Sequence, residues 1–222
     1  MLSALLQKVS QLCNSMIIDV WSDIVCPWCF IGRCRLQKAI ANHGAGHEIT
    51  VRHRAFQLQP DIKGVVPTSE HLATKYRIDK AKVAEMQANV CSIADGEGLC
   101  YNLENTLSGN TADAHRLILW AETIRRDDDL LEALYSAYFE KSKSVFSHED
   151  LLAIAEEIGI DRTAAAELLN SDEYLDRVQE DQSLASSLGA NGVPFYVVDM
   201  KFGISGAQPQ EVFDQIFAQI HA

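Results

Sequence analysis

The stretch DVWSDIVCPWCFIG, residues 19–32, ends an apolar run with two cysteines, Cys26 and Cys29, that flank a proline and a tryptophan. The residues that lead into it, MIIDVW at 16–21, have the length and apolar character of a buried strand. Pro27 suits the first position of a helix, where its missing N–H group costs nothing. The sequence therefore predicts a strand followed directly by a helix, with Cys26 at the helix N-terminus.

Two cysteines in this place are suited to thiol chemistry. A helix N-terminus has unpaired N–H groups and carries about half a positive charge, so it stabilises a thiolate at Cys26. We expect Cys29, about one turn further along, to be more shielded. Disulfide exchange requires one thiolate that attacks and a second thiol that resolves the mixed disulfide. Pro27 and Trp28, which lie between the cysteines, help to set their reactivity.

The first third of the chain has the order strand, helix, strand. From Pro27 to about Asn42 the periodicity is helical, and the segment NHGAG interrupts it. EITVRHRAF, residues 48–56, then alternates as a second strand should. A strand, a helix and a strand in this order predict a parallel pair with a right-handed crossover.

Helical periodicity dominates the middle of the chain, from about residue 68 to residue 188. Ser147 with Asp150 resembles a capping box, and Gly159 is the expected stop of that helix. Polar residues that can accept a hydrogen bond from a free N–H group predict the helix starts. These residues are Asp79, Thr111, Ser147, Asp161 and Ser171.

The last part of the chain returns to strands. PFYVVD and KFGIS, around a tight DMK connection, predict a hairpin, and Pro209 opens a helix with an apolar stripe. We therefore predict an α/β fold in which one small domain, residues 16–61 and 189–222, is split by an all-helical insertion domain, residues 62–188. Residues 1–15 form an N-terminal extension.

Charge and composition narrow the range of functions. The 222 residues include 19 basic and 31 acidic side chains, for a formal net charge of −12, and 47% are hydrophobic. Because neutralisation of phosphates dominates the affinity for nucleic acids, we expect no nucleic-acid partner. No apolar run reaches the roughly 20 residues that a membrane span needs, so we expect no membrane partner.

The N-terminus and the use of cysteine favour the cytoplasm. The opening MLSALLQKVSQLCNS lacks the basic region and cleavage site of a secretory signal. It is either a short amphipathic extension or an upstream start, with Met16 as the beginning of the fold. The chain has six cysteines, and their spacing is not that of a secreted disulfide framework. We therefore expect a cytoplasmic protein.

Several short motifs together resemble one family. They are SDIVCPWCFIG, FQLQP at 56–60, NTADAH at 110–115, GVPF at 192–195 and SGAQ at 205–208. This set is similar to the thioredoxin superfamily, within it to the DsbA-like group, and most of all to its FrnE-like cytoplasmic branch. The resemblance covers nearly everything from residue 16 onward. It implies a thioredoxin fold with a large all-helical insertion domain.

The resemblance also implies an activity, that of a thiol-disulfide oxidoreductase that uses a Cys-Pro-Trp-Cys redox pair. Cys26 and Cys29 would be the catalytic residues, and the peptide bond before Pro194 would be cis and packed against them. The residues that would bind substrate are Pro27, Trp28, Val193, Pro194 and His115. The additional C-terminal cysteine motif of some members of the branch is absent from this sequence.

Expected partners are protein disulfides or small thiols. No cofactor is expected, although glutathione is a candidate co-substrate, and the oligomeric state is either a monomer or a homodimer. The second hypothesis is a glutathione-dependent transferase or isomerase, similar to kappa-class glutathione transferases and hydroxychromene-carboxylate isomerases. Those relatives have a serine where Cys26 stands, so the retention of both Cys26 and Cys29 favours disulfide exchange.

Two further classes are weaker. A zinc site at Cys26 and Cys29 would need two more ligands, and Cys34 points to the opposite side of the helix, so no metal is expected. A redox-inactive scaffold is disfavoured because the two cysteines and Pro194 are all retained. Cys91 and Cys100 are either spare thiols or a pair folded together.

Two ionisable residues have alternative interpretations. Asp23 is either a proton acceptor for Cys29 or a solvated carboxylate at the end of a strand. His115 is either a histidine on a helix face with a satisfied hydrogen bond or, as the resemblance implies, part of a segment that faces the active-site cleft.

Overall fold

The computed structural model describes residues 15–43 and 48–220, so the predicted N-terminal extension lies outside the described residues except for Ser15. In chain order the elements are β1 (Ser15–Ser22), α2 (Pro27–His43), β2 (Glu48–Ala55), β3 (Val66–Pro67), α3 (Thr68–Tyr76), α4 (Lys80–Glu97), β4 (Leu107–Ser108), α5 (Ala112–Thr123), α6 (Asp127–Tyr135), the π-helical turn η1 (Ser136–Glu140), α7 (His148–Glu157), α8 (Arg162–Leu169), α9 (Leu175–Ser187), β5 (Phe195–Val198), β6 (Phe202–Ser205) and α10 (Gln210–Ile220).

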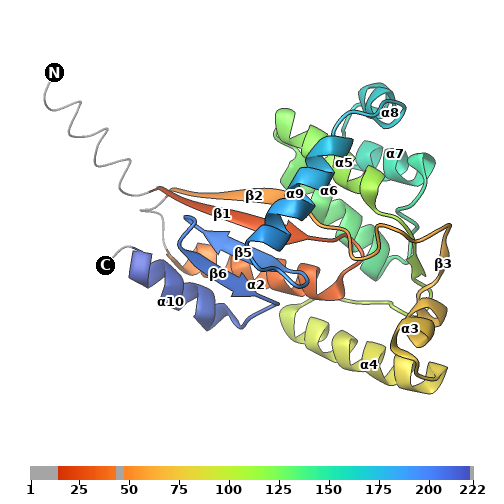
Figure 1. Cartoon of the computed structure of the whole chain (residues 1–222), viewed down its shortest axis with the longest axis horizontal. Helices are drawn as coiled ribbons and strands as arrows, with labels where there is room; N and C mark the ends of the chain where they lie inside the picture. Colours follow the sequence, from red (N-terminus) through yellow and green to blue (C-terminus); the bar gives the residue numbers. More distant parts are fainter. Residues whose placement is uncertain (1–14, 44–47, 221–222) are drawn as a thin grey trace, which may run out of the picture.

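A four-stranded sheet in the order β2-β1-β5-β6 forms the centre of the α/β part (Figure 1). Strand β1 pairs in parallel with β2, from Ser15 opposite Glu48 to Ser22 opposite Ala55. It pairs antiparallel with β5, and β5 and β6 form the predicted hairpin. The predicted parallel strand-helix-strand unit and the hairpin are both confirmed.

The two faces of β1 pack against different helices. Met16, Ile18 and Val20 belong to a buried cluster that also contains Phe213 and Phe217 of α10, so the predicted apolar stripe of α10 is confirmed. Helices α2 and α10 lie along this face of the sheet in Figure 1. On the other face, the Trp21 indole N–H group donates to the carbonyl oxygen of Asp181 in α9, at 2.8 Å.

Helices α3 to α9 all lie between β2 and β5 in the sequence; α3 to α8 extend beyond one end of the sheet, whereas α9 crosses its face (Figure 1). Their largest buried cluster includes Ile24, Cys26, Cys29, Phe30 and Ile31, which belong to the turn after β1 and the start of α2. The segment that carries the cysteine pair is thus packed into the core of the helical part. The division at residues 61 and 189 stays a prediction.

The predicted helix caps are confirmed at Asp79, Ser147 and Asp161, whose side chains each accept a hydrogen bond from the backbone N–H group three residues later. Gly159 follows α7 with φ +80°, a conformation that favours glycine, as expected for a helix stop. Of the residues described, no helix combines the length and the apolar character required to cross a membrane.

Two predicted helix caps need correction. Thr111 precedes α5, but its side chain makes no capping bond. The side chain of Asn110 accepts from the Ala112 N–H group instead, at 2.8 Å. Ser171 does not start α9, which begins at Leu175. Its hydroxyl group donates to the carbonyl oxygen of Leu168 at 2.7 Å, so it closes the end of α8.

A small second sheet also lies in the region where the sequence predicts only helices. It consists of the two-residue strands β3 and β4, which pair antiparallel. Strands of two residues are too short to produce a periodicity, so the sequence contained no pattern that could predict them.

Candidate functional site

Cys26 is the last residue before α2, and Pro27 is the first residue of that helix, as predicted. The Cys26 N–H group donates to the carbonyl oxygen of Asp23 at 3.0 Å, which forms the turn between strand and helix. The Cys26 sulfur lies 3.5 Å from the carbonyl oxygen of Val193. The thiol is thus held between the N-terminus of α2 and a loop 167 residues away in the sequence.

Cys29 lies one turn further along α2, and both thiols of the pair are buried, with exposed fractions of 2% for Cys29 and 4% for Cys26. Burial raises the pKa of the Cys29 thiol well above its usual value, and the neighbouring Cys26 thiol and the Asp23 carboxylate add to the increase. A third thiol of the same helix, Cys34, is half-buried, and burial raises its pKa to about 11. The two sulfurs of the pair therefore differ in environment, as the sequence predicts.

The Val193–Pro194 peptide bond is cis, which confirms the expectation. The Gly206 N–H group donates to the carbonyl oxygen of Pro194 at 2.8 Å and ties the loop to the end of the hairpin. The loop approaches α2 closely at Gly32. A Cβ atom at Gly32 would lie 2.2 Å from the Tyr196 hydroxyl oxygen and 3.1 Å from Pro194 Cγ. Because Gly32 has no side chain, α2 can lie in direct contact with Pro194 and Tyr196.

Asp23 is not a solvated carboxylate, so that interpretation of the sequence was wrong. The residue is 1% exposed, and its Oδ2 atom accepts from the Leu58 N–H group at 2.7 Å. Its Oδ1 atom lies 3.4 Å from His115 Nε2. The strand does not end at the surface here, because the loop after β2 and helix α5 cover its end.

His115 is buried beside Asp23, and no hydrogen bond of good geometry satisfies its Nε2 atom. The interpretation as a helix-face histidine with a satisfied hydrogen bond was therefore wrong. The side chain lies under the site and is not among the residues that line the groove next to Cys26. Its assignment to substrate binding stays a prediction. In the structure, the buried carboxylate of Asp23, three residues before the first cysteine, lies 3.4 Å from the buried imidazole of His115.

A group of aromatic residues under the cysteine pair was not predicted from the sequence. The Tyr101 hydroxyl donates to the carbonyl oxygen of Pro27 at 2.7 Å and so fixes the first turn of α2. Phe30 stacks on Tyr135, and Tyr101 stacks on Phe139, each with ring centroids 4.9 Å apart. These contacts join α2 to the segments around α6, which are about 100 residues apart in the sequence, so no local pattern could reveal them.

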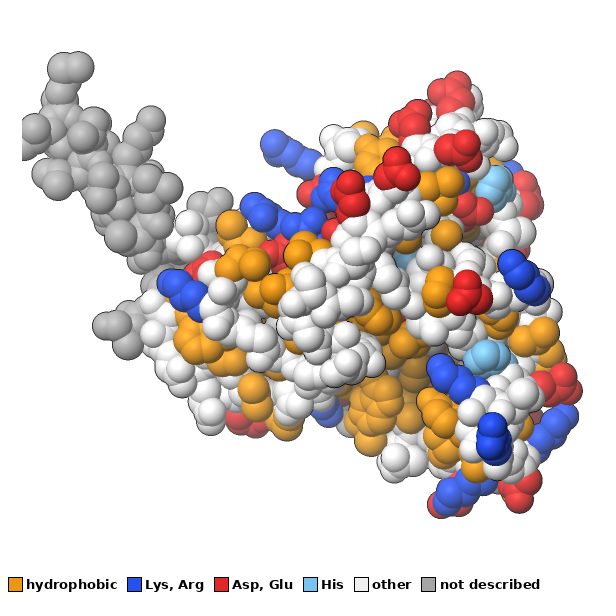
Figure 2. All heavy atoms as spheres, viewed as in Figure 1, with side chains coloured by type: hydrophobic (Ala, Val, Ile, Leu, Met, Phe, Trp, Pro, Cys, Tyr) orange, Lys and Arg blue, Asp and Glu red, His pale blue; other side chains and the backbone are white. Residues whose placement is uncertain are grey.

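Beside Cys26 the surface is hollowed into a groove of about 310 Å³. Pro27, Trp28 and Val193, three of the residues predicted to bind substrate, line it together with Cys26. Pro194, the fourth, is buried behind this wall. Figure 2 shows hydrophobic side chains on both sides of the hollow between the α3–α4 lobe, at the lower right, and the rest of the molecule.

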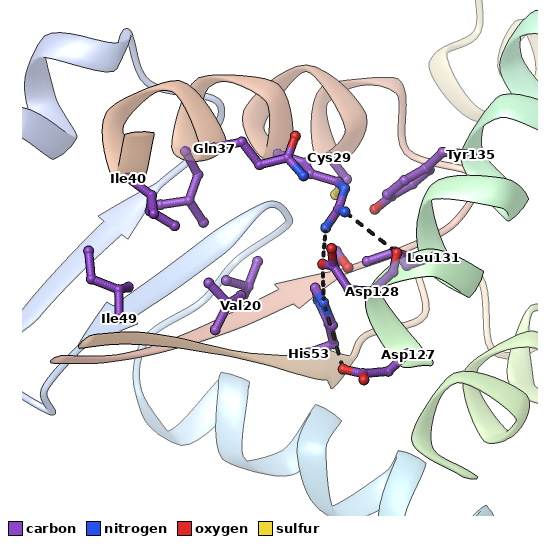
Figure 3. Close-up of a pocket in the computed structure, with 14 residues that line it drawn as sticks. Val20, Cys29, Gln37, Ile40, Ile49, His53, Asp127, Asp128, Leu131 and Tyr135 are labelled. Atoms are coloured by element: carbon purple, nitrogen blue, oxygen red, sulfur yellow. Dashed lines mark hydrogen bonds and ion pairs between the residues drawn. The ribbon is translucent and has the colours of Figure 1, made fainter. Parts of the chain in front are cut away.

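Cys29 also faces a second cavity, of about 380 Å³, on the other side of α2. Figure 3 shows this cavity between α2, the strands β1 and β2, and α6, with the apolar side chains of Val20, Ile40 and Ile49 at one end. The other end is polar: Arg33 donates to Asp128 at 2.7 Å, and His53 Nε2 lies 3.1 Å from the same carboxylate.

The remaining described cysteines form no second pair. Cys91 is half-buried, with its sulfur 3.9 Å from the carbonyl oxygen of Tyr101, and Cys100 is exposed. Both are free thiols. Within residues 15–43 and 48–220, no group of three or more His, Cys, Asp or Glu side chains is arranged to hold a metal ion.

A family model and a solved structure that match this chain both belong to DsbA-like proteins. A family model described as a DSBA-like thioredoxin domain matches residues 17–218. The crystal structure of a probable DsbA oxidoreductase from Streptomyces coelicolor is 37% identical in sequence, with a TM-score of 0.88, over 92% of this chain and 89% of that one.

Two more distant structures share the fold alone. The cytosolic disulfide reductase DsbM from Pseudomonas aeruginosa, solved with glutathione, is 17% identical, with a TM-score of 0.63 over 93% of this chain and 100% of that one. A 2-hydroxychromene-2-carboxylate isomerase is 18% identical, with a TM-score of 0.67 over 92% of this chain and 95% of that one.

Proposed function

Because the chain belongs to the DSBA-like thioredoxin domain family, we propose that it is a thiol-disulfide oxidoreductase that works through Cys26 and Cys29. One observation carries the proposal. Cys26 stands at the N-terminus of α2, against Val193 of the loop that contains the cis bond, and opens on a groove, while Cys29 is shielded behind it.

The proposed reaction follows from this asymmetry. The Cys26 thiolate attacks one sulfur of a substrate disulfide, a bond forms between the two sulfurs, and the other substrate sulfur leaves as a thiolate that takes up a proton. Cys29 then loses its proton and attacks the Cys26 sulfur, which releases the second substrate thiol. Two electrons pass to the substrate, and the protein is left as the Cys26–Cys29 disulfide. The reverse sequence oxidises a dithiol.

The groups around the pair support each step. Cys26 stands at the N-terminus of α2, the end of a helix that favours an anionic group. The raised pKa of Cys29 keeps it protonated until the mixed disulfide forms. The buried Asp23 carboxylate is the nearby acceptor that we propose for the Cys29 proton, and His115 Nε2 lies 3.4 Å from its Oδ1 atom.

The first experiment is an equilibration of the full chain in a series of glutathione redox buffers, followed by alkylation and mass measurement. We expect one two-electron transition between the dithiol and the Cys26–Cys29 disulfide. Its midpoint separates a reductant near about −270 mV from an oxidant near about −120 mV. A chain that forms no intramolecular disulfide, and instead carries one stable glutathione on Cys26, would support the glutathione-dependent transferase or isomerase.

Two variants assign the roles of the cysteines. Cys26→Ser should abolish exchange with disulfide substrates, because the attacking sulfur is gone. Cys29→Ser should accumulate mixed disulfides at Cys26, because the resolving thiol is missing. Equal trapping by both variants would refute this assignment. A cytoplasmic location, suggested by the cysteine usage, belongs to the same proposal.

A further inference from the structure

The groove beside Cys26 has two walls from different parts of the chain. Cys26, Trp28 and Val193 form one wall, and residues of α3 and α4 form the other. The α3–α4 wall presents Leu72, Met86 and Val90, which are apolar and need no hydrogen bonds. An engineered protein cavity of about 150 Å³ holds one benzene molecule. The 310 Å³ of this groove can therefore accept a substituted aromatic ring or a branched aliphatic group of similar size.

Most polar side chains in the groove are already bonded to the protein, and an exception is Gln59, whose Oε1 atom is buried without a hydrogen-bond partner in the described part of the chain. The Ser108 hydroxyl donates to Thr68 Oγ1 at 3.2 Å, and Thr68 Oγ1 lies 3.5 Å from the Tyr138 hydroxyl. The Gln87 amide donates to the carbonyl oxygen of Leu103 at 3.1 Å. Since these groups have partners, the groove offers an occupant chiefly apolar contact.

The rim of the groove also exposes large hydrophobic side chains. Tyr76 is 52% exposed and Met86 is 38% exposed, and both line the groove. Helix α3 has no buried residue, so packing against the rest of the protein does not explain why it carries apolar side chains on this side. Exposed apolar residues around a hollow that contains a reactive sulfur indicate contact with a ligand.

A single positive charge supplements the apolar wall. Lys75 lines the groove from α3, and its Nζ atom lies 5.9 Å from the centroid of the Tyr76 ring. Among the residues that the structure describes, no carboxylate forms an ion pair with it. An ammonium group beside an aromatic ring and an apolar groove suits an anionic substituent on an apolar ligand.

We propose that the substrate is a low-molecular-weight disulfide, one half of which is an aromatic or branched aliphatic group that carries a carboxylate. The apolar half binds between Trp28 and the α3–α4 wall, and Lys75 binds the carboxylate. Cys26 attacks the sulfur of this half and forms a mixed disulfide with it, and the other half leaves as a thiolate. This inference rests on the proposed function and specifies the substrate class of the same site.

The test uses the full chain in its dithiol form, in single-turnover reactions, with three disulfides. 5,5′-Dithiobis(2-nitrobenzoate) is aromatic and anionic, 2,2′-dithiodipyridine is aromatic and neutral, and bis(2-hydroxyethyl) disulfide is polar and neutral. Each reaction consumes one disulfide, yields two thiols and leaves the protein disulfide, so no other reductant is needed. Rates are compared between variants for each probe, which removes the intrinsic reactivity of the probe.

Lys75→Gln should lower the second-order rate with the nitrobenzoate probe by about two- to fivefold, the range that one exposed ion pair supports, and leave the other probes unchanged. Val90→Asn should slow both aromatic probes and spare bis(2-hydroxyethyl) disulfide, because it places a polar amide in the apolar wall. The matched control is Lys82→Gln, which removes a lysine of α4 that pairs with Glu85 and does not line the groove.

The possible failures are distinguishable. If the unmodified chain reduces none of the three probes, the proposed function fails. If it reduces all three, but Lys75→Gln and Val90→Asn slow them equally or not at all, the proposed function stands and the substrate class is wrong. If the variants slow the reduction of a scrambled protein and none of the small probes, the groove binds polypeptide and the proposal is overturned.

Discussion

At the scale of single residues, the clearest difference in the site is between the two sulfurs of α2. Because burial raises the pKa of Cys29 well above its usual value, we expect its thiol to stay unmodified near neutral pH while Cys26 reacts with iodoacetamide. Cys29 should become reactive only in strongly alkaline solution. Peptide mass mapping after brief alkylation at several pH values measures this directly.

Two built-in comparisons accompany that experiment. Exposed Cys100 should be alkylated first and reports that the reagent is active. Cys26→Ser removes the second cause of the raised pKa but leaves the burial of Cys29, so Cys29 should remain slow in that variant. Modification of Cys29 at the same rate as Cys26 would contradict the difference in environment that the proposed mechanism requires.

Gly32 gives a second prediction at this scale. In Gly32→Ala, the new Cβ atom would clash with the Tyr196 hydroxyl oxygen, so α2, the buried Tyr196 side chain or both must shift. We expect a loss of about 1 to 3 kcal/mol in the free energy of unfolding, the usual cost of overpacking. Urea denaturation measures it.

The Tyr196→Phe background tests the cause of that loss. The Tyr196 hydroxyl is buried without a hydrogen-bond partner, so its removal alone should cost little. It also removes the atom nearest to the new Cβ, so Gly32→Ala should be less damaging in this background. Strictly additive effects of the two substitutions would show that the contact between the hydroxyl and the helix is not the source of the strain.

At the scale of elements, Arg33 joins α2 to α6. Its side chain is 10% exposed and donates to Asp128 at 2.7 Å and to Glu132 at 2.8 Å. We expect Arg33→Gln to lower the free energy of unfolding by about 1.5 to 3 kcal/mol, the range for hydrogen bonds to charged groups. Lys38→Gln is the control, because that lysine is exposed and its partner Glu97 keeps Arg35.

The effect of Arg33→Gln should depend on pH. The hydrogen bond from His53 and the Arg33 guanidinium hold the pKa of Asp128 well below its usual range. A carboxylate whose pKa is lowered on folding stabilises the fold above its unfolded pKa, about 3.9, and loses that contribution as the pH falls through its folded pKa. The difference in stability between the variant and the original chain should therefore shrink below about pH 4.

The ionic strength provides a check on this interpretation. Asp128 is 60% exposed, so salt should screen part of its interaction with Arg33. Urea denaturation of both chains at low and at high salt, across the acidic range, measures both effects. A stability difference that stays constant from neutral to strongly acidic pH would mean that packing of the Arg33 side chain, rather than its charge, joins the two helices.

The same elements show what the sequence can and cannot predict. Strand β1, helix α2 and the caps at Asp79 and Ser147 depend on neighbouring residues, and their predictions were correct. A solvated carboxylate was one of two interpretations of Asp23, and it was wrong because the loop and the helix that cover this residue come from distant parts of the chain.

The candidate site divides in the same way. Cys26, Pro27, Trp28 and Val193 belong to short motifs, and the structure brings all of them to one groove. The α3–α4 wall that completes the groove could not be predicted. Its residues have the sequence pattern of an ordinary helix face, and only the tertiary structure places them opposite Cys26. Local chemistry is therefore visible in the sequence, whereas the shape of the substrate site depends on tertiary contacts.

At the scale of the whole molecule, helix α2, which carries Cys29 and begins directly after Cys26, connects the core under the sheet to the core of the helical part. Cys26, Cys29 and Phe30 belong to the buried cluster of the helical part, while Leu36 of the same helix belongs to the cluster under the sheet. Helix α2 thus has its first turns in one core and its later turns in the other. We infer that the two cores unfold as one cooperative unit.

This inference predicts reciprocal effects of core substitutions. Leu134, fully buried in α6, belongs to the helical cluster, and Phe217, fully buried in α10, belongs to the cluster under the sheet. Leu134→Ala and Phe217→Ala should each lower the free energy of unfolding by about 2 to 5 kcal/mol. In native-state hydrogen exchange, each should lower the protection of the amides of β1 and of α7 by the same amount.

If Leu134→Ala weakened α7 and left β1 protected, the helical part would open on its own. Helix α2 would then not transmit stability from one core to the other, and the cysteine pair would lie at a boundary between two independent units.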